Sequence, residues 1–154
     1  MSGRSVEHAT LVVERTYKVS PERAFAAWAE PKAKARWFVG SEASLELDFR
    51  VGGRERSRGT APDGNAYSYQ ALYQDIVPAE RIVYTYDMHL QERRISVSLA
   101  TVEFRPVGDS GTGLVFTEQG AFLDGREFPA RRAQGWGSLL DALEQEVQSE
   151  AAGA

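Results

Sequence analysis

The sequence predicts an α+β domain in which a curved antiparallel sheet of about seven strands packs against one long C-terminal helix. Three observations predict it. Apolar and polar residues alternate with period two through most of the chain, which is typical of half-buried strands. Short turns separate these segments, which favours antiparallel neighbours. The final segment has the apolar spacing of an amphipathic helix instead, and such a helix needs a surface to cover.

Size and composition are those of one ordinary globular domain. The 154 residues are 42% hydrophobic and 26% charged, so neither disorder nor a membrane span is indicated. The net charge of -4 argues against nonspecific nucleic-acid binding, because that binding depends on Lys and Arg neutralising phosphates. The lack of cysteine excludes disulfides, thiolate nucleophiles and cysteine-ligated zinc. No apolar block opens the sequence, so no signal peptide is predicted and a cytoplasmic location is expected.

The N-terminal part predicts one strand followed by two short helices. Alternation from Thr10 to Val19 indicates the strand. Ser20 suits the N-cap and Pro21 the first helical position, so a short helix is expected to run to about Ala29. A proline then breaks the helix, and a second short helix is expected to end at Gly40 as its C′ residue.

Six further strands are expected, separated by glycine, proline and aspartate turn signals. On the strand from Arg94 to Arg105, Ser96, Ser98 and Ala100 put small side chains on one face. The pattern leaves open which face is inside, and a bulge would reconcile the two halves of the strand. The six strands cover Ser44 to Val51, a segment with Arg54 to Arg58, Tyr67 to Val77, Arg81 to Met88, Arg94 to Arg105, and Leu114 to Phe122.

The last element is a helix that begins at Pro129, with residues 149–154 as a frayed tail. Gly135 and Gly137 flank Trp136 inside it, and each costs about 1 kcal/mol relative to alanine. They either leave room above a cavity or reflect simple packing of the helix on the sheet. The apolar stripe consists of Trp136, Leu139, Leu140, Leu143 and Val147, with Arg131, Arg132, Asp141, Glu144 and Gln145 mostly on the other side.

Seven short pieces, in order along the chain, resemble one branch of a known superfamily. Together with the order of the elements, they make the chain resemble the START-like (SRPBCC) superfamily, which includes the major birch-pollen allergen and polyketide cyclases. Within it the chain is similar to the branch of Hsp90 ATPase activator homologues. The pieces are Arg15-Thr16-Tyr17, Ser20-Pro21-Glu22, Trp37-Phe38, Asp48 to Gly53, Ile76 to Thr85, Thr117 to Gly120, and Gly135-Trp136.

The resemblance covers about Leu11 to Val147 and implies the helix-grip fold. It implies a single START-like domain over residues 1–154, with a core of about 10–148. It also implies a cavity between the sheet and the last helix, commonly used in the superfamily for lipids, sterols, flavonoids or polyketides. Fold and chemistry are separable, so the resemblance predicts architecture more strongly than function.

Glu118 is the sharpest candidate for a functional side chain. It shares the parity of Leu114 and Phe116, so its carboxylate is expected to point inward. Arg15 likewise lies on the apolar face of the first strand. Because a lone buried charge is costly, we expect the two to pair with each other or with a ligand, unless both lie at the end of the sheet and reach water.

Other candidate groups have competing interpretations. Tyrosines concentrated on the central strands either line a cavity or form cross-strand aromatic pairs. Arg54, Arg56 and Arg58 share one face of a strand. This pattern favours a solvent-exposed edge strand, whose charges oppose pairing with other chains, over an anion-binding site. His8 and His89 lie far apart, in the tail and in an expected loop, and the sequence has no metal-ligand spacing, nucleophile–base pair or phosphate loop. No catalytic residue, metal or cofactor is therefore predicted.

The main hypothesis is a protein that binds a small apolar or aromatic molecule in a cavity between the sheet and the last helix. No nucleic-acid or membrane partner is expected, and a homodimer through an exposed sheet edge is compatible with the pattern. The alternatives are a polyketide cyclase-like enzyme and a co-chaperone or regulatory interaction module. The predicted ligand-binding residues are Trp37, Phe49, Tyr69, Tyr84, Phe116, Glu118, Phe122, Trp136 and Leu140, with Glu118 as the polar contact.

Overall fold

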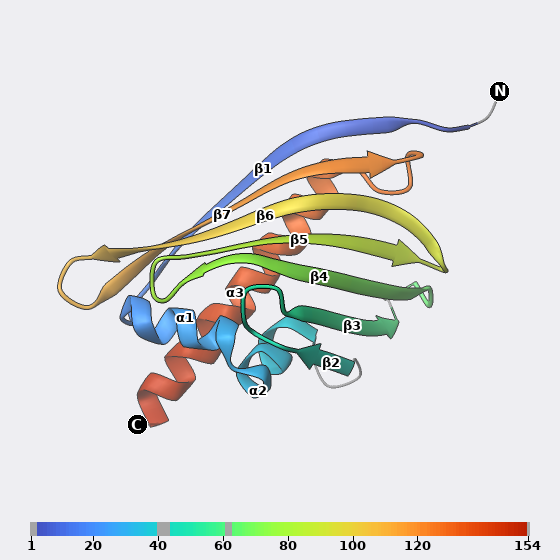
Figure 1. Ribbon diagram of the computed structural model, residues 1–154. Coiled ribbons are helices and arrows are strands. Elements are labelled where there is room, and N and C mark those ends of the chain that lie inside the picture. Colours follow the sequence, from blue (N-terminus) through green and yellow to red (C-terminus); the bar gives the residue numbers. More distant parts are fainter. Residues whose placement is uncertain (1–2, 40–43, 61–62, 154) are drawn as a thin grey trace.

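The computed structural model describes residues 3–39, 44–60 and 63–153, and it confirms the predicted α+β fold (Figure 1). Within these residues, seven antiparallel strands form one curved sheet in the order β1-β7-β6-β5-β4-β3-β2. The elements are β1 (Val6–Tyr17), α1 (Pro21–Ala29), α2 (Pro31–Lys34), the π-helical turn η1 (Ala35–Val39), β2 (Ser44–Leu47), β3 (Arg54–Thr60), β4 (Ala66–Val77), β5 (Arg81–Leu90), β6 (Arg93–Val107), β7 (Gly111–Leu123) and α3 (Pro129–Gly153).

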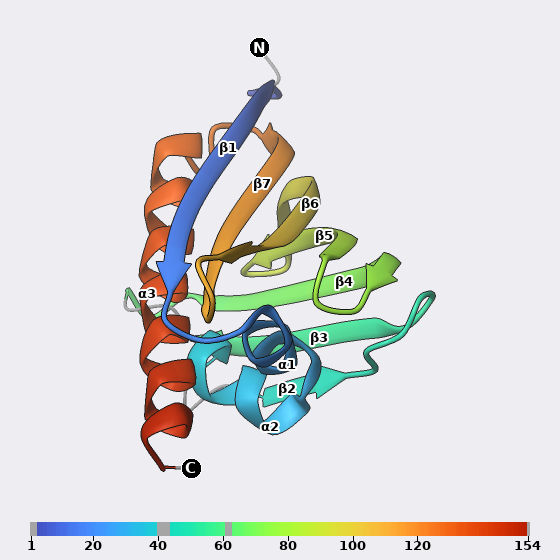
Figure 2. The same ribbon diagram turned by 90° about the vertical axis from the view of Figure 1, so that its left-hand side faces the viewer.

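The long helix α3 packs on the inner face of the sheet, which is the predicted helix-grip arrangement. Figure 2 shows α3 along one side of the curved strands, with α1 and α2 beside its C-terminal half. Trp136, Leu140, Leu143 and Val147 are buried because residues three, four and seven apart share one helix face. The Tyr17 hydroxyl donates a hydrogen bond to the Leu140 carbonyl at 2.9 Å, which ties β1 to α3.

The two short helices follow the predicted signals. Ser20 caps α1, because its Oγ accepts a hydrogen bond from the Arg23 amide at 3.2 Å and Pro21 takes the first helical position. The second segment is α2 followed by the π-helical turn η1 rather than one regular helix. Such turns are frequent at functional sites. Gly40, the expected C′ residue, lies outside the described residues.

Several element boundaries differ from the prediction, and the largest differences lie at β1, β2 and α3. β1 begins earlier, at Val6, and α3 continues to Gly153 through the segment expected to fray. The strand expected to reach Val51 ends at Leu47, because the chain turns sharply after it. In that turn the Gly53 amide donates to the Arg50 carbonyl at 2.7 Å. A Cβ on Gly53 would lie 2.1 Å from the Asp48 carbonyl oxygen, so only glycine fits.

The small side chains of β6 face inward. Ser96, Ser98 and Ala100 are buried on the same face as Val102 and Phe104. β6 pairs with β7 without a break from Ser96 to Val107, so the expected bulge between its halves is not needed. The irregularity lies instead in the pairing of β5 with β6, between Met88 and His89. Small residues on this face leave room for long side chains from α3.

Replacing Gly135 with alanine is expected to raise the free energy of unfolding by about 1 kcal/mol, because alanine is the better helix former. Gly135 is exposed, and a Cβ there would meet no atom within 4 Å, so this glycine does not make room above a cavity. At Gly137 a Cβ would lie 3.2 Å from Arg15 Nη2, so Gly137→Ala should gain less. Urea denaturation of both variants measures the difference, and a destabilised Gly135→Ala would contradict it.

Candidate functional site

Trp136 lies at the centre of an aromatic cluster between α3 and the inner face of the sheet. Its ring stacks on Phe116 of β7, with ring centroids 4.1 Å apart. The rings of Phe38 from η1 and Trp28 from α1 lie 5.8 Å and 6.3 Å from it. These large rings therefore contact one another across the interior beneath Trp136, and the expected cavity there stays a prediction.

The other predicted ligand-binding residues lie on the same side of the sheet. Phe49 is half-buried, and its ring packs edge-on against Tyr73 at 5.0 Å. The structure thus brings the predicted residues together around one interior, while their role in binding stays a prediction. The buried members, besides Phe116 and Trp136, are Trp37, Tyr69, Tyr84, Glu118, Phe122 and Leu140.

Glu118 points inward, as predicted, but its ionic partner is Arg132 of α3. Arg132 Nη1 lies 2.9 Å from Glu118 Oε2 and donates to the Tyr86 hydroxyl at 2.9 Å. The Tyr86 hydroxyl in turn donates to Glu118 Oε1 at 2.5 Å. The Glu118 side chain is fully buried and that of Arg132 is 6% exposed. A closed triangle of a cation, an anion and a phenol therefore lies inside the protein.

Four more side chains complete this cluster, which we call the Arg132 network. Ser98 Oγ donates to Glu118 at 2.6 Å, and Arg132 also bonds Ser96 Oγ at 2.8 Å and Glu127 at 2.5 Å. Trp136 Nε1 donates to the Tyr86 hydroxyl at 3.3 Å, which connects the network to the aromatic cluster.

Arg15 does not reach Glu118, and the predicted pairing between them is wrong. Arg15 Nε lies 2.9 Å from Asp141 Oδ1, and Nη2 donates to the Gly137 carbonyl at 3.2 Å. Its side chain is 31% exposed. It therefore joins β1 to the solvent side of α3 and takes no part in the interior.

Burial sets the protonation of the Arg132 network. It raises the pKa of Tyr86 well above the usual value, and the neighbouring Glu118 adds to this rise. Burial also acts to lower the pKa of Arg132, but Tyr86, Glu127 and Glu118 outweigh it, so the pKa of Arg132 is raised. Tyr86 therefore stays a neutral donor beside a permanently charged guanidinium.

A second buried ion pair lies at the other side of the interior, and we call it the Lys34 network. Lys34 Nζ lies 2.8 Å from Glu55 Oε1, and both side chains are fully buried. The Tyr73 hydroxyl donates to the same oxygen at 2.5 Å. Lys34 Nζ also lies 4.7 Å from the centre of the Phe38 ring and 5.3 Å from that of Trp28, within range of cation–π attraction. Burial lowers the pKa of Lys34, against the opposing effect of Glu55.

The buried tyrosines predict a steep loss of stability in alkali. Burial raises the pKa of five of the six tyrosines, so the folded state holds protons above pH 10 that the unfolded state releases. Their contribution to stability is complete below pH 10 and is lost as pH rises beyond it, at about 1.4 kcal/mol per group and pH unit. We expect their tyrosinate absorbance to appear together with loss of the folded circular dichroism signal. Ionisation of all five tyrosines while the protein is still folded would contradict this prediction. The five residues are Tyr17, Tyr69, Tyr73, Tyr84 and Tyr86.

Several polar atoms of the interior lack hydrogen-bond partners within the part of the chain that the structure describes. They are Glu55 Oε2, Ser57 Oγ, and the hydroxyls of Tyr69 and Tyr84, together with Trp28 Nε1. All five residues are at most 4% exposed. The Tyr86 ring lies 4.9 Å from that of Tyr69 and 5.9 Å from that of Tyr84, so a band of polar groups crosses the inner face of the sheet.

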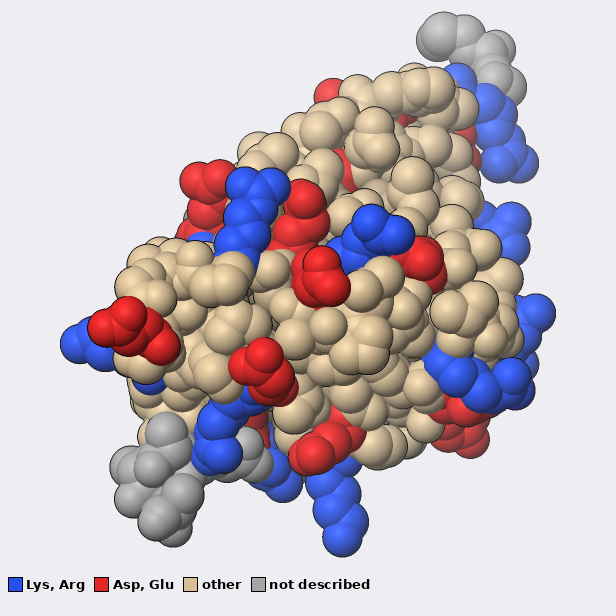
Figure 3. Space-filling model, turned by 60° about the vertical axis from the view of Figure 1, so that its left-hand side comes forward, with Lys and Arg blue, Asp and Glu red and all other residues tan. Residues whose placement is uncertain are grey.

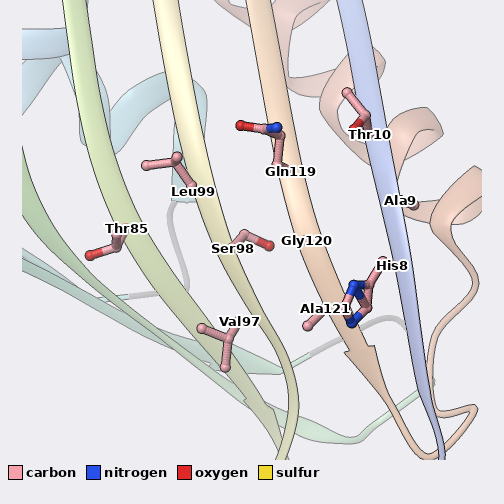
Figure 4. Close-up of a pocket in the computed structure, with 10 residues that line it drawn as sticks. All are labelled: His8, Ala9, Thr10, Thr85, Val97, Ser98, Leu99, Gln119, Gly120 and Ala121. Carbon is pink, nitrogen blue, oxygen red and sulfur yellow. The ribbon is translucent and has the colours of Figure 1, made fainter.

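The outer face of the sheet carries two shallow, open hollows. The larger, of about 610 Å³, lies over β1, β7, β6 and β5, and Figure 4 shows Val97, Leu99 and Gln119 at its surface, on the side away from the helices. The second, of about 320 Å³, lies beside Arg54 and Asp87. None of the predicted ligand-binding residues lines either hollow.

The exposed charges form no single-sign surface on the face seen in Figure 3, where Lys and Arg are interspersed with Asp and Glu. Arg54, Arg56 and Arg58 do face outward from β3. They are not at the sheet edge as expected, because the four-residue strand β2 lies outside β3. Their outward position fixes Glu55 and Ser57 on the inner face, since neighbouring residues of a strand point to opposite sides.

Three buried charged residues were not predicted, although the sequence carries a signal for each. Arg132 was expected on the solvent side of α3, but it lies four residues before Trp136 and so shares its helix face. Lys34 lies three residues before Trp37 in a helical segment, and Glu55 alternates with the outward arginines. The usual exposure of Lys, Arg and Glu argued against burial in each case.

The described residues show no group of three or more His, Asp or Glu side chains suited to hold a metal ion. His8 lies in β1, and His89 lies in β5 rather than in a loop. Within the same described ranges, no helix is both long enough and apolar enough to cross a bilayer.

Comparisons with known proteins agree with this architecture. The family described as Activator of Hsp90 ATPase homolog 1-like protein matches residues 18–148. An uncharacterised protein from Rhizobium leguminosarum is 46% identical over 95% of this chain and 98% of its own, with a TM-score of 0.89. The Mll3558 protein from Rhizobium loti is 47% identical over 92% of this chain and 99% of its own, with a TM-score of 0.86. Comparison with curated proteins gave no match.

Proposed function

Since the chain belongs to the Activator of Hsp90 ATPase homolog 1-like family, whose fold commonly binds hydrophobic ligands, we propose that it binds a small, largely apolar molecule between the sheet and α3. The walls of the site are the aromatic cluster around Trp136, Phe116 and Phe38. The Arg132 network and the Lys34 network border it on two sides. The cyclase-like enzyme and the interaction module stay predictions from sequence.

The observation that carries this proposal is the set of buried polar atoms on the inner side of the sheet that find no hydrogen-bond partner among the described residues. A buried polar group left unpaired typically costs about 1–3 kcal/mol, and native proteins contain few of them. Here the hydroxyls of Ser57, Tyr69 and Tyr84 gather in one interior among aromatic rings. A bound molecule with an apolar body and a polar end would satisfy them.

Binding is expected to involve the movement of one side chain, because aromatic rings contact one another across the interior. Phe38 is the half-buried member of the aromatic cluster, and its ring packs on Tyr69 at 5.1 Å and on Trp136 at 5.8 Å. Turning the Phe38 side chain outward would open a route from solvent to Tyr69 and Trp136. The bound state is then a rearranged form of the structure, as in many sites that open only with their ligand.

Thermal unfolding with and without added 4-ethylphenol, 2-naphthol or 1-decanol tests the proposal. A ligand that binds only the folded state raises the midpoint with concentration. We expect at least one of the three to do so, and Phe38→Ala to speed binding as followed by tryptophan fluorescence. Phe128→Ala is the control, because Phe128 is 68% exposed. No change in midpoint, together with no co-purified molecule by native mass spectrometry, would contradict the proposal.

A further inference from the structure

We propose that the bound molecule is uncharged and carries a hydroxyl group, which is recognised at a polar subsite formed by Glu55, Ser57, Tyr69 and Tyr84. This inference rests on the proposed function and narrows it to one class of ligand, an aromatic alcohol or phenol. It is carried by the position of these four side chains, by the two charges beside them and by what each unpaired atom can donate or accept.

The four side chains come from three adjacent strands and share the inner face of the sheet. Ser57 of β3 lies opposite Tyr69 of β4, and Glu55 is two residues before Ser57 on the same face. Tyr84 of β5 lies opposite Tyr73, whose hydroxyl holds Glu55 Oε1 and leaves Oε2 without a partner. The subsite therefore lies where β3, β4 and β5 meet the Lys34 network.

Electrostatic effects also place these groups close together. Burial raises the pKa of both Tyr69 and Tyr84, and the nearby Glu55 carboxylate raises both further. The rings of Tyr69 and Tyr84 lie 4.9 Å and 5.9 Å from the ring of Tyr86, so both phenols belong to the same part of the inner face.

The charges beside the subsite exclude a charged ligand. A carboxylate would bring a second negative charge against Glu55, and an amine would bring a second positive charge against Lys34, 2.8 Å from that carboxylate. The other interior cation, Arg132, is already paired with two carboxylates. A ligand charge would therefore be buried without a free counter-ion, and its desolvation costs more than hydrogen bonds return.

The hydrogen-bonding inventory favours a neutral group that both donates and accepts, of which a hydroxyl is the smallest. Glu55 Oε2 only accepts, whereas the hydroxyls of Ser57, Tyr69 and Tyr84 both donate and accept. A ligand hydroxyl can donate to Oε2 and accept from a tyrosine at once. A ketone or an ether only accepts, so it would leave Oε2 unpaired. The rings of Phe38 and Tyr69, 5.1 Å apart, favour a planar body next to that hydroxyl.

Calorimetric titration with three matched compounds tests this at neutral pH. 4-Ethylphenol, 4-ethyltoluene and 4-ethylbenzoate differ in one substituent, which is a hydroxyl, a methyl or a carboxylate. We expect 4-ethylphenol to bind about tenfold more tightly than 4-ethyltoluene, which corresponds to about 1.4 kcal/mol of binding free energy. We expect 4-ethylbenzoate to bind more weakly than either. Equal affinity of phenol and toluene would overturn the inference and leave the proposed function standing. Failure of all three to bind would overturn the inference, while the proposed function would still be decided by the thermal midpoints and the native mass spectrum.

Conservative variants locate the contact. Tyr69→Phe and Tyr84→Phe should each weaken binding of 4-ethylphenol about tenfold and leave that of 4-ethyltoluene unchanged. Tyr67→Phe is the matched control, because Tyr67 lies on the same strand as Tyr69 but is half-buried and outside the subsite. Circular dichroism melts confirm that each variant folds. Phenol affinity that survives both subsite variants would place the hydroxyl elsewhere and overturn the inference.

Discussion

Replacing Arg132 with methionine is expected to lower the free energy of unfolding by about 3–5 kcal/mol, which is the usual effect of breaking a buried ion pair. The change leaves the fully buried Glu118 with only the neutral donors Tyr86 and Ser98. Methionine keeps much of the side-chain length, so the loss reflects the unpaired charge more than a cavity. Urea denaturation measures it, provided that the slope of the transition is unchanged.

Two comparisons separate the ion pair from general damage to α3. Arg131→Met alters the exposed neighbour of Arg132 and should stay within about 0.5 kcal/mol of the parent. The double variant Arg132→Met with Glu118→Gln removes both charges and should recover most of the loss. A single variant that loses less than about 1 kcal/mol would show that Glu118 is solvated, contrary to the full burial of its side chain.

Replacing Lys34 with methionine is expected to lower the free energy of unfolding by a similar amount, about 3–5 kcal/mol. Glu55 would then keep one neutral donor, the Tyr73 hydroxyl, and no counter-charge. The cation–π contacts of the ammonium with Phe38 and Trp28 would be lost as well. The measurement is again the urea transition.

The double variant Lys34→Met with Glu55→Leu makes the sharper prediction. It should be as stable as the parent or more stable, because an apolar pair often replaces a buried ion pair without loss. Lys32→Met, two residues earlier and exposed, is the control and should have little effect. A double variant that stays as unstable as Lys34→Met alone would mean that the pair is kept for stability, which removes one reason to assign it a functional role.

Both ion pairs bear on function through the same physical argument. A core built only for stability would be apolar, since desolvating two charges offsets most of their attraction. This interior holds two such pairs, together with several hydroxyls that have no hydrogen-bond partner among the described residues. Polar groups arranged at a cost to stability are typical of sites that bind or react.

The architecture could be predicted from the sequence because the residues within each helix or strand determine its type and its buried face. Alternation placed Leu114, Phe116 and Glu118 on the inner face of β7, and the structure has all three buried. Helical spacing likewise placed Trp136 and Leu140 against the sheet. These patterns depend only on the period of a strand or a helix, which neighbouring residues determine.

The interior contacts could not be predicted in the same way, because they join distant elements. Lys34 pairs with Glu55, which lies 21 positions later in the chain. Arg132 was expected on the solvent side of α3, so Arg15 was the partner predicted for Glu118, whereas Arg132 is its partner in the structure. Periodicity tells which face a side chain occupies, but it does not tell how far along that face its partner lies. The stacking of Trp136 on Phe116 depends on the same three-dimensional arrangement.

The most direct test of interior binding is a titration of isotope-labelled protein with 4-ethylphenol, followed through the indole N–H signals of its three tryptophans. Trp136 Nε1 donates to Tyr86, and Trp28 Nε1 lacks a partner in the described structure. We predict that both signals shift and saturate together. Saturable binding that moves the amides of Val97 and Leu99, in the outer hollow, and leaves all three indoles in place would contradict the account.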